Sequence, residues 1–209
     1  IHREGENVGV LVAGGPDGEE GDLTSVDVKR LDAAANAIAI LLSSARMLED
    51  LHSMFMGTLH ALTSAIDAKD PYTRGHSERV AHLAHALSLR MGIDPATSER
   101  NRVSGLVHDI GKIGVREAVL RKPGRLTDEE YSEMKRHPEI GHRILADIPE
   151  FDDVLPGVLH HHERYDGKGY PAGLAGQNIP LMGRIICLAD CFDAMTSNRT
   201  YRKALPLEV

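Results

Sequence analysis

The sequence contains no tryptophan, and aromatic residues make up only 4% of its 209 residues. A core without large rings has to be built from leucine, isoleucine, valine, alanine and methionine, which suits packed helices. The chain also lacks an excess of positive charge, because its formal net charge is −7. We therefore do not expect a protein that binds DNA through phosphate contacts. A small anionic substrate is still compatible with this charge if cations or a local basic patch neutralise it.

Cysteine is scarce as well. Cys187 and Cys191 form no zinc-binding or redox pattern with a further cysteine, so a reducing, cytoplasmic location is the simplest interpretation. No secretory signal peptide is visible at the start. The most apolar run, 33–42, is interrupted by Asn36 and is too short to span a bilayer, so we expect no membrane segment here. Because the chain begins at Ile1 and not at methionine, we expect it to be part of a longer protein.

The first third of the chain predicts a strand, a loop and a helix. Residues 7–13 predict the strand, and residues 14–22 predict a loop rich in glycine and acids. The helix is expected to start near Thr24, where Asp27 supplies a pattern like a capping box. Its apolar residues alternate in spacings of mostly three and four, with one phase shift: Val28, Leu31, Ala35, Ile38, Leu42, Ala45, Leu48, Leu51, Phe55, Leu59, Leu62 and Ile66.

This apolar row favours one long connector helix that pairs with a second copy of the chain. About forty helical residues would span roughly 60 Å. The alternative is two helices that break near Gly57 and pack on the body of a monomer. Over about the first 45 residues, the strand, loop and helix resemble the last elements of a GAF-type sensor domain. We therefore expect a GAF-like remnant of an upstream α/β domain at 1–27, a connector at 28–69 and a main domain at 70–209.

The main domain is predicted to be a helical bundle, because no strand of useful length is expected after the connector. Thr127 and Glu130 form a capping box, and Pro180 suits the first turn of the last helix. The expected helices are 77–91, 95–108, 127–137, 140–146, 154–162 and 181–196. The fold class is therefore mainly α.

Most of the twelve histidines fall between His76 and His162. One belongs to a His108–Asp109 pair, which offers an imidazole nitrogen and a carboxylate from one point on the backbone. Alone, such a pair is more often a polar helix end. The apolar neighbours of Asp109, however, make its carboxylate costly unless it is paired or bound to a cation. Lys112 supplies a compact charge that suits either a phosphate or a nearby acid.

A second group of polar residues runs from His160 to Pro171. Adjacent histidines at a helix end can reach one cluster, and we expect two of residues 160–162 to do so. The following segment, 166–169, allows a close approach of the backbone to a ligand. Tyr170 offers either a flat face for a base or a buried anchor for the loop.

Asp190 lies on a predicted helix that is apolar nearly all round, so its carboxylate is expected in the interior, where it needs a cation or a donor. Asp193 is the weaker candidate, and His76 and His137 are single histidines of the kind that is more often structural. Mixed imidazole and carboxylate ligands favour iron, manganese or another octahedral-tolerant cation over structural zinc. Two such cations about 3.5–4 Å apart would hold a bridging hydroxide for attack at phosphorus, which predicts phosphoester hydrolysis.

Five motifs follow one another between Asp70 and Arg202. They are Asp-Pro-Tyr-Thr-Arg-Gly-His-Ser-Glu-Arg-Val (70–80), His-Asp-Ile-Gly-Lys-Ile-Gly (108–114), His-Pro-Glu-Ile-Gly (137–141), His-His-Glu-Arg-Tyr-Asp-Gly-Lys-Gly-Tyr-Pro (161–171) and Ala-Asp-Cys-Phe-Asp-Ala-Met-Thr-Ser-Asn-Arg-Thr-Tyr-Arg (189–202). In this order and spacing they resemble the HD-GYP family. The resemblance implies an HD-type helical bundle that hydrolyses cyclic di-GMP to pGpG, GMP or both, through a hydroxide that bridges two divalent ions of iron or manganese.

The resemblance also implies a role for each matching residue. The metal ligands would be His76, His108, Asp109, His137, His161, His162 and Asp190. The catalytic residues would be His108, Asp109 and Lys112, of which Asp109 would bridge the metals and Lys112 would contact the phosphate. The substrate would contact Asp70, Lys112, Gly169, Tyr170, Pro171, Arg199 and Arg202.

The chain departs from the family in two ways. Members with a third metal carry a glutamate four residues before the position of His76, where this chain has Tyr72, so we expect two metals. The chain also stops at Val209, where the family normally continues through further helices, so the domain is expected to be truncated. The alternatives are the same chemistry on another cyclic or linear dinucleotide, such as cyclic GMP-AMP or pGpG, and a module that binds nucleotide or protein without turnover. Besides the substrate, the expected partners are a second copy of the chain and GGDEF-type or response-regulator proteins, but neither DNA nor a membrane.

Overall fold

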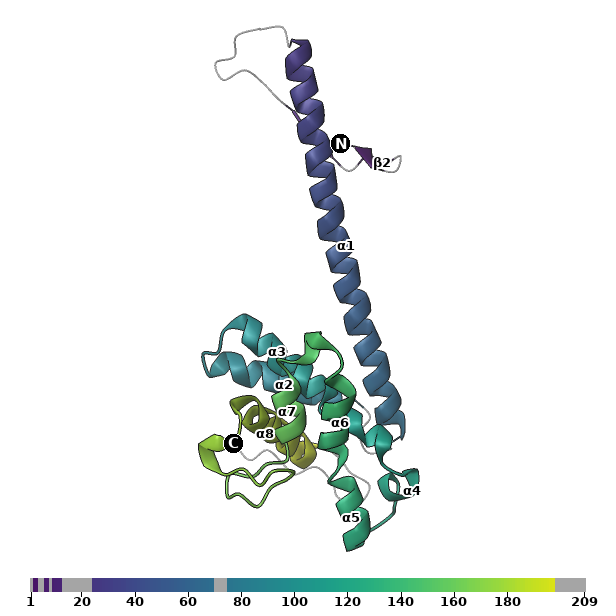
Figure 1. Ribbon diagram of the computed structural model, residues 1–209, viewed down its shortest axis with the longest axis vertical. Coiled ribbons are helices and arrows are strands. Elements are labelled where there is room, and N and C mark those ends of the chain that lie inside the picture. Colours follow the sequence, from purple (N-terminus) through teal and green to yellow (C-terminus); the bar gives the residue numbers. More distant parts are fainter. Residues whose placement is uncertain (1, 4–5, 8, 13–23, 70–74, 198–209) are drawn as a thin grey trace. The chain divides into compact units, whose positions relative to one another are not determined.

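The computed structural model describes residues 2–3, 6–7, 9–12, 24–69 and 75–197, which are mostly helical (Figure 1). The chain divides into two compact units, Ile1–Gly57 and Thr58–Val209. Three of the expected substrate contacts, Asp70, Arg199 and Arg202, lie outside the described residues.

The first unit contains a short pair of strands. β1 (His2–Arg3) pairs antiparallel with β2 (Glu6–Asn7). The strand predicted over 7–13 is wrong over residues 9–12, which are irregular. The side chains of Val10 and Val12 are each 85% exposed, and a strand is not stable without a partner strand or a core to cover. The remnant of an upstream α/β domain therefore stays a prediction.

The long helix predicted from the apolar row is confirmed. α1 (Ser25–Lys69) runs for 45 residues without a break, so the alternative of two helices is wrong. The predicted capping box is present, since the backbone N–H of Asp27 donates to Thr24 Oγ1 (3.3 Å) and that of Thr24 donates to Asp27 Oδ2 (3.1 Å). Gly57 does not interrupt the helix, and apart from its chain neighbours and the backbone of α1 itself nothing lies within 4 Å of the place that a Cβ would take there.

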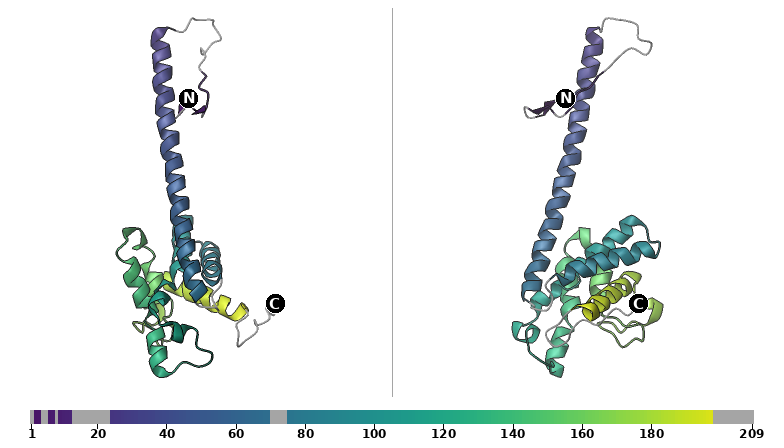
Figure 2. Two further views of the ribbon diagram at one scale, coloured as in Figure 1. Left: turned by 90° about the vertical axis from the view of Figure 1, so that its right-hand side faces the viewer. Right: turned by 180° about the vertical axis from the view of Figure 1, so that it is seen from behind.

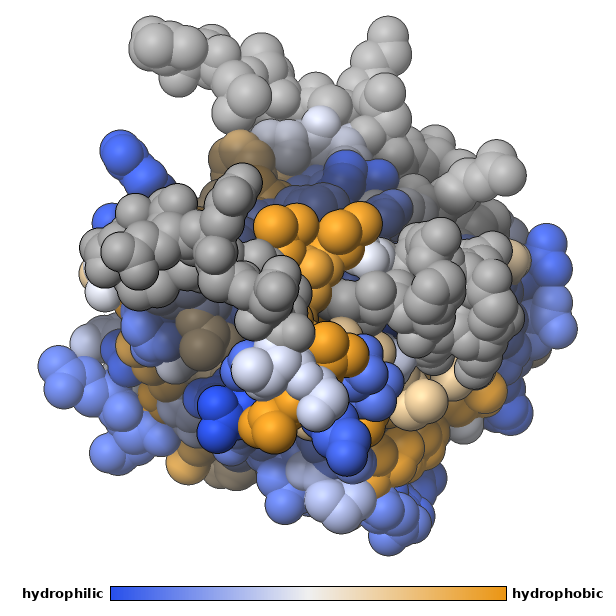
Figure 3. Space-filling view, turned by 90° about the horizontal axis from the view of Figure 1, so that it is seen from above, coloured by the Kyte–Doolittle hydropathy of each residue, from blue (hydrophilic) through white to orange (hydrophobic). Residues whose placement is uncertain are grey.

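Much of the apolar row of α1 is exposed. Hydrophobic side chains reach the molecular surface in several places (Figure 3). Those of α1 with large exposed fractions are Val26, Val28, Ile40, Leu41, Leu42, Met47, Leu48, Leu51, Met54 and Leu62. By length and composition alone α1 could cross a membrane, because an 18-residue window has a mean hydropathy of 1.3 and only 6% of it is buried. The shortness of the run 33–42 therefore does not exclude a membrane-spanning helix. The expected absence of a membrane segment stays a prediction.

The second unit is a bundle of helices, as predicted. Its elements are α2 (His76–Arg90), α3 (Pro95–Val107), η1 (Ile110–Gly114), α4 (Glu117–Leu120), α5 (Asp128–Met134), α6 (His137–Leu145), η2 (Pro149–Phe151), α7 (Leu155–His160), η3 (Gly176–Asn178) and α8 (Leu181–Thr196). Within this bundle α2 packs against α3 and α8, α6 packs against η1 and α7, and α7 packs against α3 and α8 (Figure 2).

The helix boundaries differ from prediction mainly around His137. One helix was expected to end there and the next to begin at Ile140, whereas α5 ends at Met134 and α6 already begins at His137. Proline lacks a backbone N–H and is tolerated in the first turn of a helix, so Pro138 fits the start of α6 and would not fit the interior of a longer helix. His137 therefore lies at the first turn of α6.

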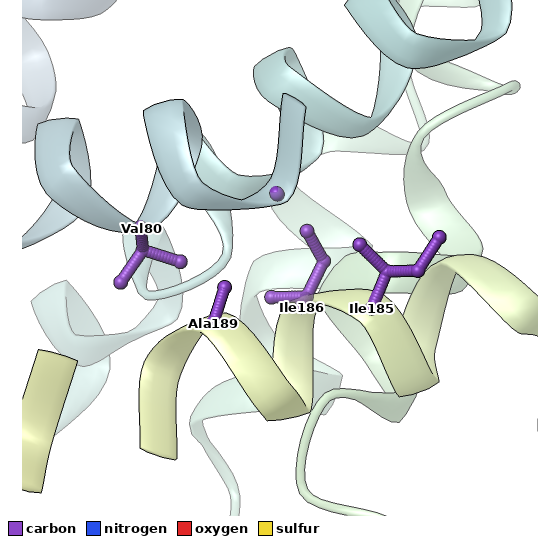
Figure 4. Packing of buried hydrophobic residues seen from close by; sticks show 5 residues of the cluster. Val80, Ile185, Ile186 and Ala189 are labelled. Carbon is purple, nitrogen blue, oxygen red and sulfur yellow. The ribbon is translucent and has the colours of Figure 1, made fainter. Parts of the chain in front are cut away.

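The contact of α2 with α8 forms the core beside the site. Val80 and Ala84 of α2 pack against Ile185, Ile186 and Ala189 of α8 (Figure 4). Full burial of an isoleucine contributes roughly 1.5–3 kcal/mol, so these residues fix the position of α8 firmly.

The prediction that α8 is buried nearly all round is wrong. Leu181, Leu188, Phe192 and Met195 are 38–56% exposed. The buried face of α8 carries Asp193 beside the apolar residues. One face of α8 is therefore buried in the bundle, and its other face is exposed although it is also apolar.

Candidate metal centre

The histidines and aspartates expected as metal ligands come from five segments and meet at one place in the second unit. His76 starts α2, His108 and Asp109 follow α3, His137 starts α6, His161 and His162 follow α7, and Asp190 lies within α8. Two groups of these residues each bring their ligand atoms within 4.8 Å of one another: Asp109, His137, His161 and His162 form one group, and His76, His108 and Asp109 form the other. Asp109 belongs to both.

The two carboxylate oxygens of Asp109 face different histidines. Oδ1 lies 3.2 Å from Nε2 of His137. Oδ2 lies 3.4 Å from Nε2 of His108 and 3.9 Å from Nε2 of His76. Because a carboxylate can offer one oxygen to each of two cations, this arrangement suits a bridging ligand.

Three of the histidines are held in the same way by the helix ends that carry them. In each, Nδ1 lies within hydrogen-bond distance of a backbone carbonyl three residues earlier: His108 with Gly105 (2.7 Å), His137 with Met134 (2.8 Å) and His161 with Val158 (2.8 Å). A carbonyl can only accept, so Nδ1 carries the hydrogen. Nε2, which points into the cluster, is then left with a lone pair for a metal.

His76 is oriented by a carboxylate. Its Nδ1 lies 2.7 Å from Asp193 Oδ2, and its Nε2 lies 3.3 Å from Asp190 Oδ1. Arg79, one turn along α2, donates from Nε to Asp193 Oδ1 (2.6 Å). Asp193 is therefore shared between the histidine and the guanidinium, in the manner of the carboxylates that orient metal-binding histidines.

Burial keeps three of the imidazoles neutral. It lowers the pKa of His108 and, together with His162, holds the pKa of His161 well below its ordinary value. It also lowers the pKa of His162 to about 3, helped by His137. A neutral imidazole is the form that binds a metal, so these side chains are in the right protonation state at neutral pH.

The carboxylates at the centre stay charged despite their burial. Burial would raise the pKa of Asp109, but the adjacent ammonium of Lys112 holds it well below the usual value. The Lys112 Nζ atom lies 2.7 Å from Asp109 Oδ2. Burial likewise raises the pKa of Asp190, and the hydrogen bond from His76 more than offsets that effect. Burial opposes protonation of His76 too, yet Asp190 and Asp193 raise its pKa to about 9.

Two observations indicate that these residues fit a cation. Nε2 of His108 is buried and makes no hydrogen bond to any described residue. The Nε2 atoms of His137 and His161 lie 3.2 Å apart, and with both Nδ1 atoms bonded to carbonyls they face each other with lone pairs. Such lone pairs repel unless a proton or a cation lies between them. The donor set of imidazoles and carboxylates suits a divalent transition metal.

The expected pocket loop lies beside this centre. The ring of Tyr170 is 4.8 Å from that of His162, with an angle of 32° between the planes. Tyr170 and Pro171 are half-buried, and burial raises the pKa of the Tyr170 hydroxyl. Gly169 allows the loop to pass close to the histidines, because a Cβ there would overlap the backbone of residues 162–164.

Three residues that support the centre were missed or undervalued in the sequence. Asp193 was ranked below Asp190, although it orients His76. Arg79 carried no expected role, since nothing in the sequence links it to a residue more than a hundred positions away. Glu163 follows the two histidines directly and is buried. The only sign of its importance in the sequence is that it is a charged residue within the motif 161–171.

We predict that Asp193→Asn weakens metal binding at the His76 side of the centre. Asparagine removes the charge that His76 and Arg79 share. Loss of such an outer partner typically reduces metal affinity about 10- to 100-fold. Titration of the metal-free protein with Mn²⁺ should show one weakened site and one unchanged site. Asp152→Asn is the matched control because Asp152 is exposed, and equal affinities in the two variants would contradict the role of Asp193.

A helical bundle with a buried cluster of histidines and aspartates defines the class of metal-dependent HD proteins. The sequence pattern of the HD domain family matches residues 60–209. The chain belongs to this family, and its resemblance to the HD-GYP proteins within the family is confirmed.

Several curated proteins are similar to this chain. It is 42% identical over 148 residues to the 3′3′-cGAMP-specific phosphodiesterase 3 of Vibrio cholerae. It is 41% identical over 153 residues to the cyclic di-GMP phosphodiesterase response regulator RpfG of Xanthomonas campestris, and 41% identical over 152 residues to a cyclic di-GMP phosphodiesterase of Thermotoga maritima. These alignments cover 71–72% of this chain but only 32%, 40% and 41% of the three relatives.

Proposed function

We propose that this chain is a metal-dependent phosphodiesterase that hydrolyses cyclic di-GMP to pGpG, GMP or both. The observation that carries the proposal is that imidazoles from four segments gather around one shared carboxylate, Asp109, while Asp190 of α8 lies beside His76. The relatives from Xanthomonas campestris and Thermotoga maritima, which bear the name cyclic di-GMP phosphodiesterase, support this choice of substrate.

The seven residues expected as ligands would hold two divalent ions, which we propose to be iron or manganese. Bound there, such ions polarise a phosphoryl oxygen and lower the pKa of water, which makes a nucleophile available at neutral pH. The role of the chain is to keep the imidazoles of His108, His161 and His162 neutral and the carboxylates of Asp109 and Asp190 charged, as their burial and neighbours do.

Lys112 lies where its ammonium could stabilise negative charge on a phosphate bound at the centre. Its ammonium lies 2.7 Å from Asp109 and its side chain is 15% exposed, so it is close to the cluster yet reachable by a ligand. A phosphate bound at the centre would bring further negative charge next to this ammonium. We propose that Lys112 holds the phosphate and stabilises charge that develops on it, while Tyr170 and Pro171 bound the pocket beside His162.

A second candidate substrate is 3′3′-cGAMP. The observation in its favour is that a relative of equal similarity, from Vibrio cholerae, is named for that substrate. Both dinucleotides have the same phosphodiester backbone and differ in one base, so the metal centre cannot distinguish them. The choice between them must come from contacts outside the metal ligands.

Turnover by the purified chain tests the proposal. The chain would be loaded with Mn²⁺ or, without oxygen, with Fe²⁺, and its metal content would be measured on the same sample. Cyclic di-GMP, 3′3′-cGAMP and pGpG would then be compared as substrates, with Asp109→Ala as the inactive control. We expect two metals per chain and the highest kcat/KM for cyclic di-GMP. Binding of a dinucleotide without hydrolysis by the fully loaded protein would instead indicate a non-catalytic module.

We further propose that α1 pairs with a second copy of the chain and transmits the state of an upstream domain, in the cytoplasm. The support is the exposed apolar row of α1 and its spacing, which is typical of paired helices. Light scattering on the sample used for turnover should give the mass of a dimer, and a monomeric mass would contradict the pairing. GGDEF-type or response-regulator proteins stay proposed partners.

A further inference from the structure

Glu163 is a buried acid that the proposed chemistry does not use. It follows His161 and His162 directly, and its side chain has no exposed surface. In the described part of the chain no lysine or arginine forms an ion pair with it. The imidazole of His160 is close, with Nδ1 3.7 Å from Oε1, but it makes no hydrogen bond to the carboxylate. A carboxylate in such a place is costly unless strong donors satisfy it.

Two backbone amides from the far side of the pocket loop satisfy this carboxylate. The N–H of Ala172 donates to Oε1 (2.8 Å), and the N–H of Leu174 donates to Oε2 (3.0 Å). Hydrogen bonds to a charged acceptor are about twice as strong as those between neutral groups. Both donors come just after Tyr170 and Pro171, so the carboxylate holds the chain segment that leaves the tip of the loop.

The segment that enters the tip is held to the same short stretch of backbone. The N–H of Tyr170 donates to the carbonyl of His162 (3.2 Å). Gly169 lies so close to the backbone of residues 162–164 that no side chain would fit. The tip of the loop is thus fastened on both sides to the stretch that supplies two of the expected metal ligands, and the Tyr170 ring rests 4.8 Å from the ring of His162.

We infer that Glu163 is a positioning residue that fixes Tyr170 and Pro171 beside the metal centre and thereby sets the affinity for the nucleotide part of the substrate. This inference rests on the proposed function. Glu163 reaches no reacting atom; it acts only through the loop. The role requires a carboxylate, because both oxygens must accept and an amide nitrogen can only donate.

The test variant is Glu163→Gln, and Glu150→Gln is its matched control at an exposed position. Each would be assayed with the preferred cyclic dinucleotide and with bis(4-nitrophenyl) phosphate, a diester too small to need the loop. For Glu163→Gln we expect kcat/KM for the dinucleotide to fall about ten- to a hundredfold, mainly through KM, since one loop amide loses its acceptor. Turnover of the small diester and the metal content should change less than about twofold. Equal losses on both substrates, or loss of metal, would overturn the inference.

Two further measurements complete the test, and the second does not depend on how well this variant folds. In a double-mutant cycle, Tyr170→Ala should make Glu163→Gln no worse, because both act through the loop tip, and additive losses would argue against that. In the unaltered protein, the amides of Ala172 and Leu174 should exchange hydrogen more slowly than that of Gly173, which has no partner among the described residues. Fast exchange at both would overturn the inference. If the unaltered protein hydrolyses neither cyclic dinucleotide, the proposed function fails, but amide exchange still decides whether Glu163 holds the loop.

Discussion

Replacing Asp109 by asparagine is expected to remove both high-affinity metal binding and phosphodiester hydrolysis. Asp109 is the one residue common to both ligand groups, so its loss affects both cations at once. Loss of an outer partner of a ligand already reduces metal affinity or activity about 10- to 100-fold, so loss of the shared ligand itself should reduce kcat/KM by more than that. Metal content after dialysis and the rate of dinucleotide turnover measure the two effects separately.

The same substitution should also reduce stability. Lys112 is largely buried and lies 2.7 Å from Asp109, and removal of one partner from a buried ion pair typically costs about 3–5 kcal/mol. Thermal unfolding of the metal-free proteins isolates this effect from the loss of metal. Asp152→Asn is the control, since it makes the same chemical change at an exposed position. If Asp109→Asn keeps two metals and normal turnover, Asp109 does not bridge the cations.

The positions of the expected ligands at helix ends could be predicted, because helix ends leave marks in the sequence. The apolar run before His108 stops where the polar pair begins, and His137 is predicted at a helix end, although as the last residue of one helix and not in the first turn of α6. That these ends meet at one place could not be derived from helix patterns. The prediction that they meet came from the order and spacing of five motifs. Those motifs indicate membership of a family, and they do not follow from local helix preferences.

The choice between Asp190 and Asp193 shows a limit of helix periodicity. The two residues are three apart, so they lie on neighbouring parts of the surface of α8 and either could face inward. Asp193 is the more buried of the two, because His76 and Arg79 of α2 cover it. Those partners are 117 and 114 positions away in the sequence, and no pattern within α8 reveals them.

Glu163 shows a different limit. Its partners are backbone amides, and every residue except proline has one. The residues that supply them, Ala172 and Leu174, therefore carry no sign of the contact in their side chains. Only coordinates can show that the carboxylate faces the loop and not the metals.

Replacing Gly111 by alanine is expected to disturb the centre without touching any ligand. A Cβ at Gly111 would overlap the carbonyl oxygen of His137, so η1 and the first turn of α6 can approach each other only with glycine at this position. Asp109 and His137 are held on these two elements, with 3.2 Å between Oδ1 and Nε2. The obstacle is backbone, which cannot move aside by changing a rotamer. The two elements must therefore separate, and the contact between the two ligands must lengthen.

Overpacking of this kind costs about 1–3 kcal/mol, and more where the neighbours cannot yield. For a chain of this size we expect a fall of roughly 2–12 °C in the unfolding temperature, together with a loss of metal affinity. Gly57→Ala is the matched control, because the added methyl group there meets open space in the middle of α1. In a helix interior that change should stabilise the protein by about 0.5–1 kcal/mol. The same chemical change should thus have opposite effects on stability at the two positions. If the Gly111→Ala protein is as stable and binds as much metal as the Gly57→Ala protein, the close approach of η1 to α6 does not hold Asp109 and His137 together.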